Sequence, residues 1–162
     1  MTQQTIDIVW EFLRNNRLVT VATLSAEKKT PEASLVYYSF ENLPYIYIST
    51  YKDSRKLKNI VANDTVALVI SDEAKATVLQ IEGTAKVLQD SNVKMEVIEK
   101  ISKVANQNPQ SSFFPPILSL SANSQMEFVE IKINWFKYSV FDTHFPSIIE
   151  GTPENWQERA LL

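Results

Sequence analysis

Hydroxyl and cationic side chains gather between residues 50 and 56, where the sequence predicts that a strand gives way to a helix. Thr50 ends the run YIYIST, and Ser54, Arg55 and Lys56 follow after a short turn. The first amides of a helix have no carbonyl partners and carry partial positive charge, so they attract anions. A guanidinium adds two parallel N–H donors, an ammonium adds a compact charge, and hydroxyls can donate beside them. This set suits a phosphate monoester carrying nearly two negative charges.

Asp53 and Ser54, followed by Arg55 and Lys56, would also suit a capped surface helix whose charges are solvated. Two cations in a first helical turn run mildly against the dipole, which favours acidic residues there. An anion between them would remove that conflict. Spacing alone therefore leaves both interpretations open.

Composition excludes several other kinds of site. The 162 residues contain no cysteine, one histidine (His144) and two glycines (Gly83 and Gly151). A glycine-rich phosphate loop, a disulfide and a cysteine-based metal or catalytic site are therefore excluded, and we expect no metal centre. The formal charge of −3 gives no overall attraction to nucleic acid. We expect a cytoplasmic protein without a membrane partner, because no signal peptide and no span of about 20 apolar residues are recognisable.

Hydrophobic spacing predicts the helices and strands around these residues. Helical spacing predicts helices over Thr5–Asn15, Ser54–Asp64 and Ser91–Ala105. Apolar or β-branched runs predict seven strands: Leu18–Leu24, Ala33–Phe40, Tyr45–Thr50, Val66–Ser71, Thr77–Leu88, Glu127–Asn134 and Trp135–Asp142. Most links are too short for parallel crossovers, so the sheet should be antiparallel and closed, or partly closed, into a barrel. Gly83 inside a strand indicates a bulge or a barrel corner.

The predicted domain organisation is one barrel with an N-terminal helix over residues 1–142, followed by a loosely structured tail over residues 143–162. The tail contains His144 and Trp156. A tail of this kind could pack on a dimer partner.

The order of these segments resembles that of the pyridoxamine 5'-phosphate oxidase-like family of FMN-binding split barrels. The matching runs are VTVATLS, PEASLVYYSF, YIYISTYKDSRKLKNIVANDTVALVIS, LQIEGTAKVL and KINWFKYSVFD. Their most specific part is the T-x-x-x-S-R-K core. The resemblance implies a mainly β fold, an antiparallel six-stranded split β-barrel of the FMN-binding type. It also implies a homodimer that holds each flavin at the subunit interface.

The resemblance assigns a role to the residues of this core. It implies that Thr50, Ser54, Arg55 and Lys56 contact the phosphate and ribityl chain of FMN. It also implies that Ser49, immediately before the threonine, lies against the cofactor.

Two further cofactor contacts are candidates by the same resemblance. Gln80 stands two residues from the place of a glutamine that touches the flavin ring in the family. Trp135 begins a strand at a place near the flavin ring or the dimer contact, with simple core packing as its alternative.

Two departures from the family pattern bear on function. The strand Ala33–Phe40 has none of the basic residues that true pyridoxamine phosphate oxidases carry there, and no arginine lies near His144. The sequence therefore predicts an FMN-dependent oxidoreductase with an unidentified small-molecule substrate, not a vitamin B6 oxidase. A nicotinamide donor such as NAD(P)H, or a deazaflavin, would reduce it. The alternatives are a flavin carrier or sensor without its own substrate, and a haem-binding relative with His144 as the only imidazole ligand.

Overall fold

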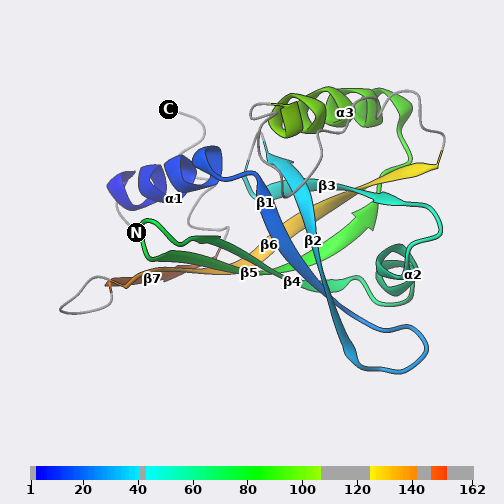
Figure 1. Cartoon of the computed structure of the whole chain (residues 1–162), viewed down its shortest axis with the longest axis horizontal. Coiled ribbons are helices and arrows are strands. Elements are labelled where there is room, and N and C mark those ends of the chain that lie inside the picture. The colour runs from blue at the N-terminus through cyan, green and yellow to red at the C-terminus, as the bar shows by residue number, and fades with distance from the viewer. Residues whose placement is uncertain (1–2, 41–42, 107–124, 142–146, 153–162) are drawn as a thin grey trace.

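The computed structural model describes residues 3–40, 43–106, 125–141 and 147–152. Along the chain, the elements are α1 (Gln3–Asn15), β1 (Leu18–Leu24), β2 (Pro31–Phe40), β3 (Tyr45–Tyr51), α2 (Arg55–Ala62), β4 (Thr65–Asp72), β5 (Thr77–Val87), α3 (Ser91–Asn106), β6 (Met126–Val140) and β7 (Ser147–Gly151). Figure 1 shows the strands crossing the molecule with the three helices around them. In the described part, no helix is long and apolar enough to cross a membrane.

Six strands close into an antiparallel barrel. The sheet order is β3-β2-β1-β4-β5-β6-β7, and β3 also pairs with β6, which joins the two ends of the six-stranded part. Tyr45 to Tyr51 of β3 run opposite Lys132 to Met126 of β6. β7 adds to the free edge of β6 outside the closed ring. The predicted six-stranded split barrel is confirmed.

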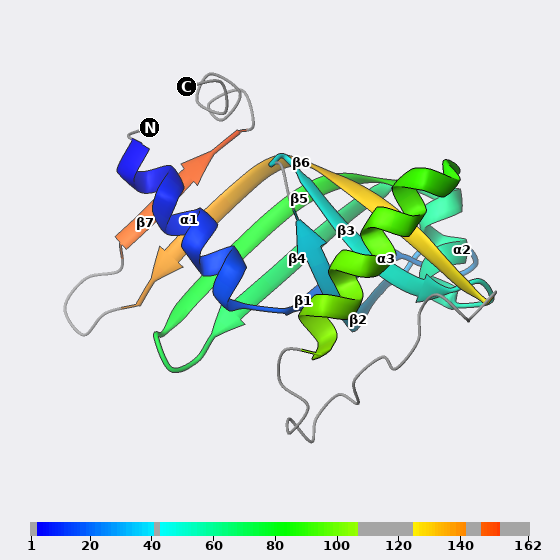
Figure 2. The same ribbon diagram turned by 90° about the horizontal axis from the view of Figure 1, so that it is seen from above.

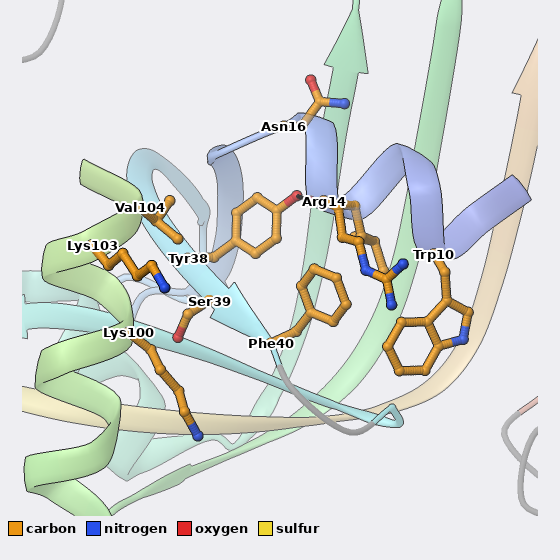
Figure 3. Close-up of a pocket in the computed structure, with 10 residues that line it drawn as sticks. Trp10, Arg14, Asn16, Tyr38, Ser39, Phe40, Lys100, Lys103 and Val104 are labelled. Atoms are coloured by element: carbon orange, nitrogen blue, oxygen red, sulfur yellow. Dashed lines mark hydrogen bonds between the residues drawn. The ribbon is translucent and has the colours of Figure 1, made fainter. Parts of the chain in front are cut away.

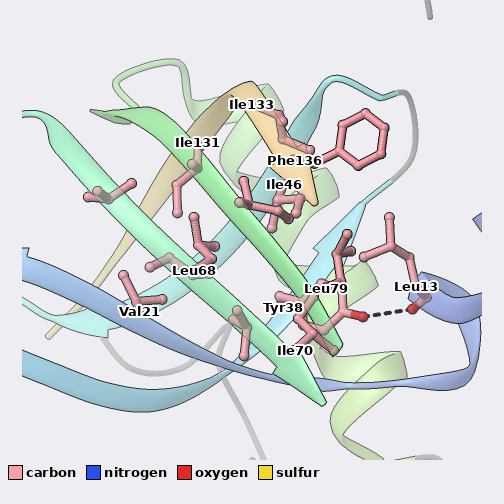
Figure 4. Packing of buried hydrophobic residues seen from close by; sticks show 14 of the residues in the cluster. Leu13, Val21, Tyr38, Ile46, Leu68, Ile70, Leu79, Ile131, Ile133 and Phe136 are labelled. Carbon is pink, nitrogen blue, oxygen red and sulfur yellow. Dashed lines mark hydrogen bonds between the residues drawn. The ribbon is translucent and has the colours of Figure 1, made fainter. Parts of the chain in front are cut away.

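The barrel interior is apolar because alternate residues of each strand point inward. Buried side chains such as Val21, Leu68, Leu79 and Ile131 fill it, as Figure 4 shows. α1 and α2 close the two ends of the barrel, and both contribute side chains to the same core.

One hydrogen bond fastens α1 to the barrel. The hydroxyl of Tyr38, on β2, donates to the carbonyl oxygen of Leu13 over 2.8 Å. Burial raises the pKa of Tyr38 far above its usual value. The phenol therefore stays protonated and keeps donating to the helix.

α3 packs on the outside of the barrel. It crosses β2 and β3, as Figure 2 shows, and covers a second apolar cluster that includes Tyr37 and Phe128. Val97 and Ile101, one turn apart on α3, supply its buried face.

The two C-terminal strands expected at 127–134 and 135–142 are in fact one strand, β6. A bulge explains the difference: Glu82 lies opposite Trp135 but Gly83 lies opposite Ile133, so Asn134 is an extra residue. An extra residue reverses the alternation of side chains, which looks like a strand end in the sequence. Gly83 stands at the register shift as predicted. A Cβ there would come within 2.8 Å of both the Ile131 side chain and the Lys132 carbonyl oxygen, so the close approach requires glycine.

The predicted loose tail contains a strand. Residues 147–151 form β7 and pair with Val140 to Phe136 of β6. Its sequence, SIIEG, shows no regular alternation of apolar and polar residues, so residue spacing did not predict this strand. His144 and Trp156 lie outside the described residues.

Candidate functional site

The N-terminal end of α2 is built by Ser54. This residue is the N-cap with extended backbone (φ −67°, ψ 146°), and its hydroxyl oxygen accepts a 3.1 Å hydrogen bond from the Leu57 amide. The same oxygen lies 2.8 Å from the Thr50 hydroxyl oxygen. Since the cap uses a lone pair of Ser54, its proton remains available for Thr50 or for a ligand.

Thr50 and Ser49 occupy opposite faces of β3. Thr50 is buried at the end of the strand and contacts Ser54, which makes it an orienting group for the Ser54 hydroxyl. Ser49 is also buried, and it lies opposite Phe128 of β6 on the side that α3 covers. The structure therefore groups Thr50 with Ser54 and turns the Ser49 side chain away from them.

Arg55 begins α2 with its side chain exposed. Its guanidinium lies 3.2 Å from one carboxylate oxygen of Glu32, which is on β2. With 82% of the arginine side chain exposed, this ion pair is weak and solvent-screened. The guanidinium can therefore turn toward a second anion at little cost.

Asn59 links α2 to the barrel. Its amide nitrogen donates to the Thr23 hydroxyl and to the other carboxylate oxygen of Glu32, both over 3.0 Å. Its amide oxygen accepts from the Ala26 backbone over 2.9 Å. Because Asn59 is buried, these three bonds hold α2 at a set position against β1 and β2.

Lys56 is the second cation of the site and is half-buried. Desolvation lowers its pKa from 10.5 to about 8. Within the described ranges, no carboxylate forms an ion pair with its ammonium. A bound anion would supply the missing counter-charge and raise this pKa again.

The residues around the start of α2 therefore form an anion-binding corner, defined by Thr50, Ser54, Arg55 and Lys56. The corner offers a hydroxyl and the first amides of the helix, with Arg55 and Lys56 in its first turn, and Glu32 pairs with Arg55. Donors of these kinds suit a phosphate dianion. Among the described residues, no cluster of histidine, cysteine, aspartate or glutamate could hold a metal ion.

Gln80 and Trp135 lie away from this corner. In the β3–β6 ladder, Thr50 stands opposite Glu127, and Trp135 comes eight residues later in β6, roughly 26 Å along an extended strand. Gln80 stands opposite Lys137, so it is a diagonal neighbour of Trp135 on the outer face of the barrel. Within one protomer, Gln80 and Trp135 therefore do not reach the anion-binding corner.

The outer face that carries Gln80 is apolar and exposed. Paired positions of β2, β1 and β4 place Ala33, Ala22 and Ala67 side by side, and Leu35 and Val69 lie in the next row. Leu35 is 42% exposed and Val69 is 40% exposed. We call these five residues the alanine face. In the described part of the chain, α2 and α3 pack elsewhere on the barrel, so this face stays open.

Sequence reasoning missed Asn59 and Glu32. On α2 the apolar Val61 is 74% exposed, and the polar Asn59 takes the buried position instead. No local signal could have found this, because the partners of Asn59 lie 27 to 36 residues away on other strands.

A family model and solved structures relate this chain to known proteins. Residues 7–139 match the sequence model of the family described as pyridoxamine 5'-phosphate oxidase. No curated protein matches the chain in sequence.

Several solved structures share the fold at low identity. A Clostridium acetobutylicum protein related to general stress protein 26, of the pyridoxinephosphate oxidase family, is 17% identical over 96% of this chain and 99% of its own (TM-score 0.71). General stress protein 26 of Bacillus anthracis is 15% identical over 92% and 100% (TM-score 0.65). The haem storage protein HutZ of Vibrio cholerae is 16% identical over 79% and 89% (TM-score 0.62). At these identities the likeness extends to the fold alone.

Replacing Asn59 with alanine should lower the free energy of unfolding by about 3 kcal/mol, because buried hydrogen-bonding partners lose their bonds. Chemical denaturation followed by circular dichroism measures the change. Val61→Ala, on the exposed side of the same helix, is the control and should change stability by less than about 0.5 kcal/mol. Equal stability of the two variants would show that Asn59 does not fasten α2.

Proposed function

Because the chain belongs to the pyridoxamine 5'-phosphate oxidase family, we propose that it binds FMN and works as a flavin-dependent oxidoreductase on a small molecule. The flavin phosphate occupies the anion-binding corner at the start of α2. A nicotinamide such as NAD(P)H would be the electron donor.

The observation that carries this proposal is the contact between Thr50 and Ser54. Their hydroxyl oxygens lie 2.8 Å apart at the helix start, and Arg55 and Lys56 follow immediately. A solvated surface helix does not require a buried threonine to orient its cap, nor a half-buried lysine without a counter-charge. Both features suit a site that receives an anion.

Each residue of the corner has a separate task in holding the phosphate. Ser54 donates its hydroxyl proton to a phosphate oxygen, and Thr50 sets the direction of that hydroxyl. Arg55 exchanges its exposed contact with Glu32 for a charge-assisted bond to the phosphate. Lys56 supplies the charge deepest in the corner. When bound, the flavin supplies two-electron redox chemistry, and the chain binds it, orients it and excludes water.

We further propose that the cofactor site is completed by a second copy of the chain. Gln80 and Trp135 are too far along the barrel from Thr50 to reach the same flavin within one protomer. Gln80 stands opposite Val69 of the alanine face, and Trp135 lies one strand further out, opposite Glu82. A homodimer through this face would bring Gln80 and Trp135 of the partner subunit toward the flavin ring.

The charge-removing variant Arg55→Ala/Lys56→Ala should bind FMN at least about a hundredfold more weakly than the wild type. Two charge-assisted bonds of about 1.5–3 kcal/mol each are lost. Titration of the purified protein with FMN, followed by flavin fluorescence, measures the affinity. Lys75→Ala/Lys86→Ala removes two exposed charges outside the corner and should leave the affinity unchanged.

The spectrum of the wild-type protein tests the cofactor itself. We expect flavin absorption bands and their bleaching by NADH or NADPH under anaerobic conditions. A flavin that no nicotinamide reduces would favour the carrier or sensor. A Soret band would favour haem, and unchanged FMN affinity in the double variant would place the phosphate elsewhere.

The FMN affinity of the wild type should fall as the pH rises above about 8. Free Lys56 loses its proton there, whereas the bound phosphate raises the lysine pKa, so binding above pH 8 requires proton uptake. The loss should be about fivefold between pH 8 and 9, because free Lys56 is already half deprotonated at pH 8. Lys56→Arg keeps its charge over this range and should give a flat profile. A wild-type profile as flat as that of Lys56→Arg would contradict this role.

Val69→Lys should convert the homodimer to a monomer, because it puts a charge on the alanine face next to Gln80. Light scattering after size-exclusion chromatography measures the mass. The monomer should bind FMN more weakly than the dimer, although its anion-binding corner is intact. Met95→Lys, an exposed apolar residue on α3, is the control and should remain dimeric. A monomeric Val69→Lys protein with full FMN affinity would show that the flavin is not shared.

A further inference from the structure

A carboxylate stands at the edge of the anion-binding corner. Through one oxygen, Glu32 of β2 lies 3.2 Å from the Arg55 guanidinium, and through the other it accepts a 3.0 Å hydrogen bond from the Asn59 amide. None of these three residues lines the cavity of about 340 Å³ between α1, the end of β2 and α3, which Figure 3 shows. The contacts of Glu32 therefore concern the corner and not that cavity.

The two partners of this ion pair are held with different firmness. The Glu32 side chain is 21% exposed, and its second oxygen is bonded to the buried Asn59. Asn59 is in turn fixed by its bonds to Thr23 and Ala26. The Arg55 side chain is 82% exposed. A ligand can therefore draw the guanidinium away, but the carboxylate stays where it is.

A phosphate that binds at the corner is opposed by this carboxylate in two ways. It must take Arg55 from Glu32, so the ion pair of the free protein is lost. It also comes to lie near a fixed negative charge, and like charges repel. Neither effect acts on an uncharged ligand.

The corner has little positive charge to offset this opposition. Its cations are Arg55 and Lys56, and β2 adds none, because residues 33–40 include no lysine or arginine. Together with Glu32, the charged side chains recorded here sum to one positive charge. The hold on a phosphate is therefore sensitive to this single carboxylate.

We propose that Glu32 is an internal competitor for Arg55, which weakens the hold of the corner on a phosphate and keeps FMN exchangeable. This inference rests on the proposed function, because it concerns the phosphate of that cofactor. An arginine without a partner would favour a flavin that is retained permanently. An arginine paired with a fixed carboxylate favours a flavin that dissociates and binds again.

Glu32→Gln tests this role, because it removes the charge and keeps an oxygen for Asn59. The variant should bind FMN about three- to fivefold more tightly than the wild type, since no ion pair is lost on binding. Fluorescence titration measures the affinity, and stopped-flow dilution should show correspondingly slower release. Riboflavin, which has no phosphate, should bind equally to both proteins.

The direction of the change separates competition from a structural role. A substitution that merely disturbed α2 would weaken FMN binding, whereas loss of a competitor strengthens it. Glu99→Gln, which removes an exposed charge on α3, is the control and should bind FMN like the wild type. Equal or weaker FMN binding by Glu32→Gln would overturn the inference.

A double-mutant cycle tests whether Glu32 acts through Arg55. In an Arg55→Ala background, Glu32→Gln should strengthen FMN binding less than about twofold, because only the direct repulsion remains to be removed. A gain as large as in the wild-type background would show that Glu32 does not compete for the guanidinium.

Inorganic phosphate separates a failure of this inference from a failure of the proposed function. If neither protein binds FMN, the proposed function fails, and phosphate decides the role of Glu32. Its binding is measured from the rise in unfolding temperature at constant ionic strength. Tighter phosphate binding by Glu32→Gln would then support the competitor, and equal binding, or none by either protein, would overturn it.

Discussion

The pairing of β3 with β6 is the constraint on which the rest of the structure depends. This ladder runs the full length of β3 and turns an open sheet into a closed barrel. Closure buries the inward-facing side chains of all six strands and leaves β6 with a free edge only where β7 joins it. It also determines where β3 ends, and therefore where Thr50 meets the start of α2.

The position of α2 depends on polar contacts as much as on apolar ones. Leu57 and Ile60 anchor the helix in the barrel core, but Asn59 determines its rotation and height through bonds to three separate residues. Glu32 has two roles in this arrangement, since one carboxylate oxygen holds Asn59 and the other faces Arg55. The carboxylate that orders the helix therefore also forms a weak, exposed ion pair with a cation of the anion-binding corner.

Local geometry outweighs the overall charge in this protein. The net charge is negative, yet the anion-binding corner places Arg55 and Lys56 beside a helix start and a buried threonine. At this corner the end of β3 meets the start of α2, so the backbone changes direction and side chains of both elements converge.

Residue types and spacing were enough to predict the class of fold, and they grouped Thr50, Ser54, Arg55 and Lys56 as a candidate phosphate site. Alternating and helical spacing predicted the order of helices and the first five strands, and the run from Thr50 to Lys56 is local enough to be read from the chain. Three features became visible only in the folded chain: the single bulged strand β6, the strand β7, and the burial of Asn59 in place of Val61. The tertiary structure also decided that Gln80 and Trp135 lie far from Thr50. These features depend on pairing between residues distant in sequence, and hydrophobic spacing within one segment carries no information about its partner.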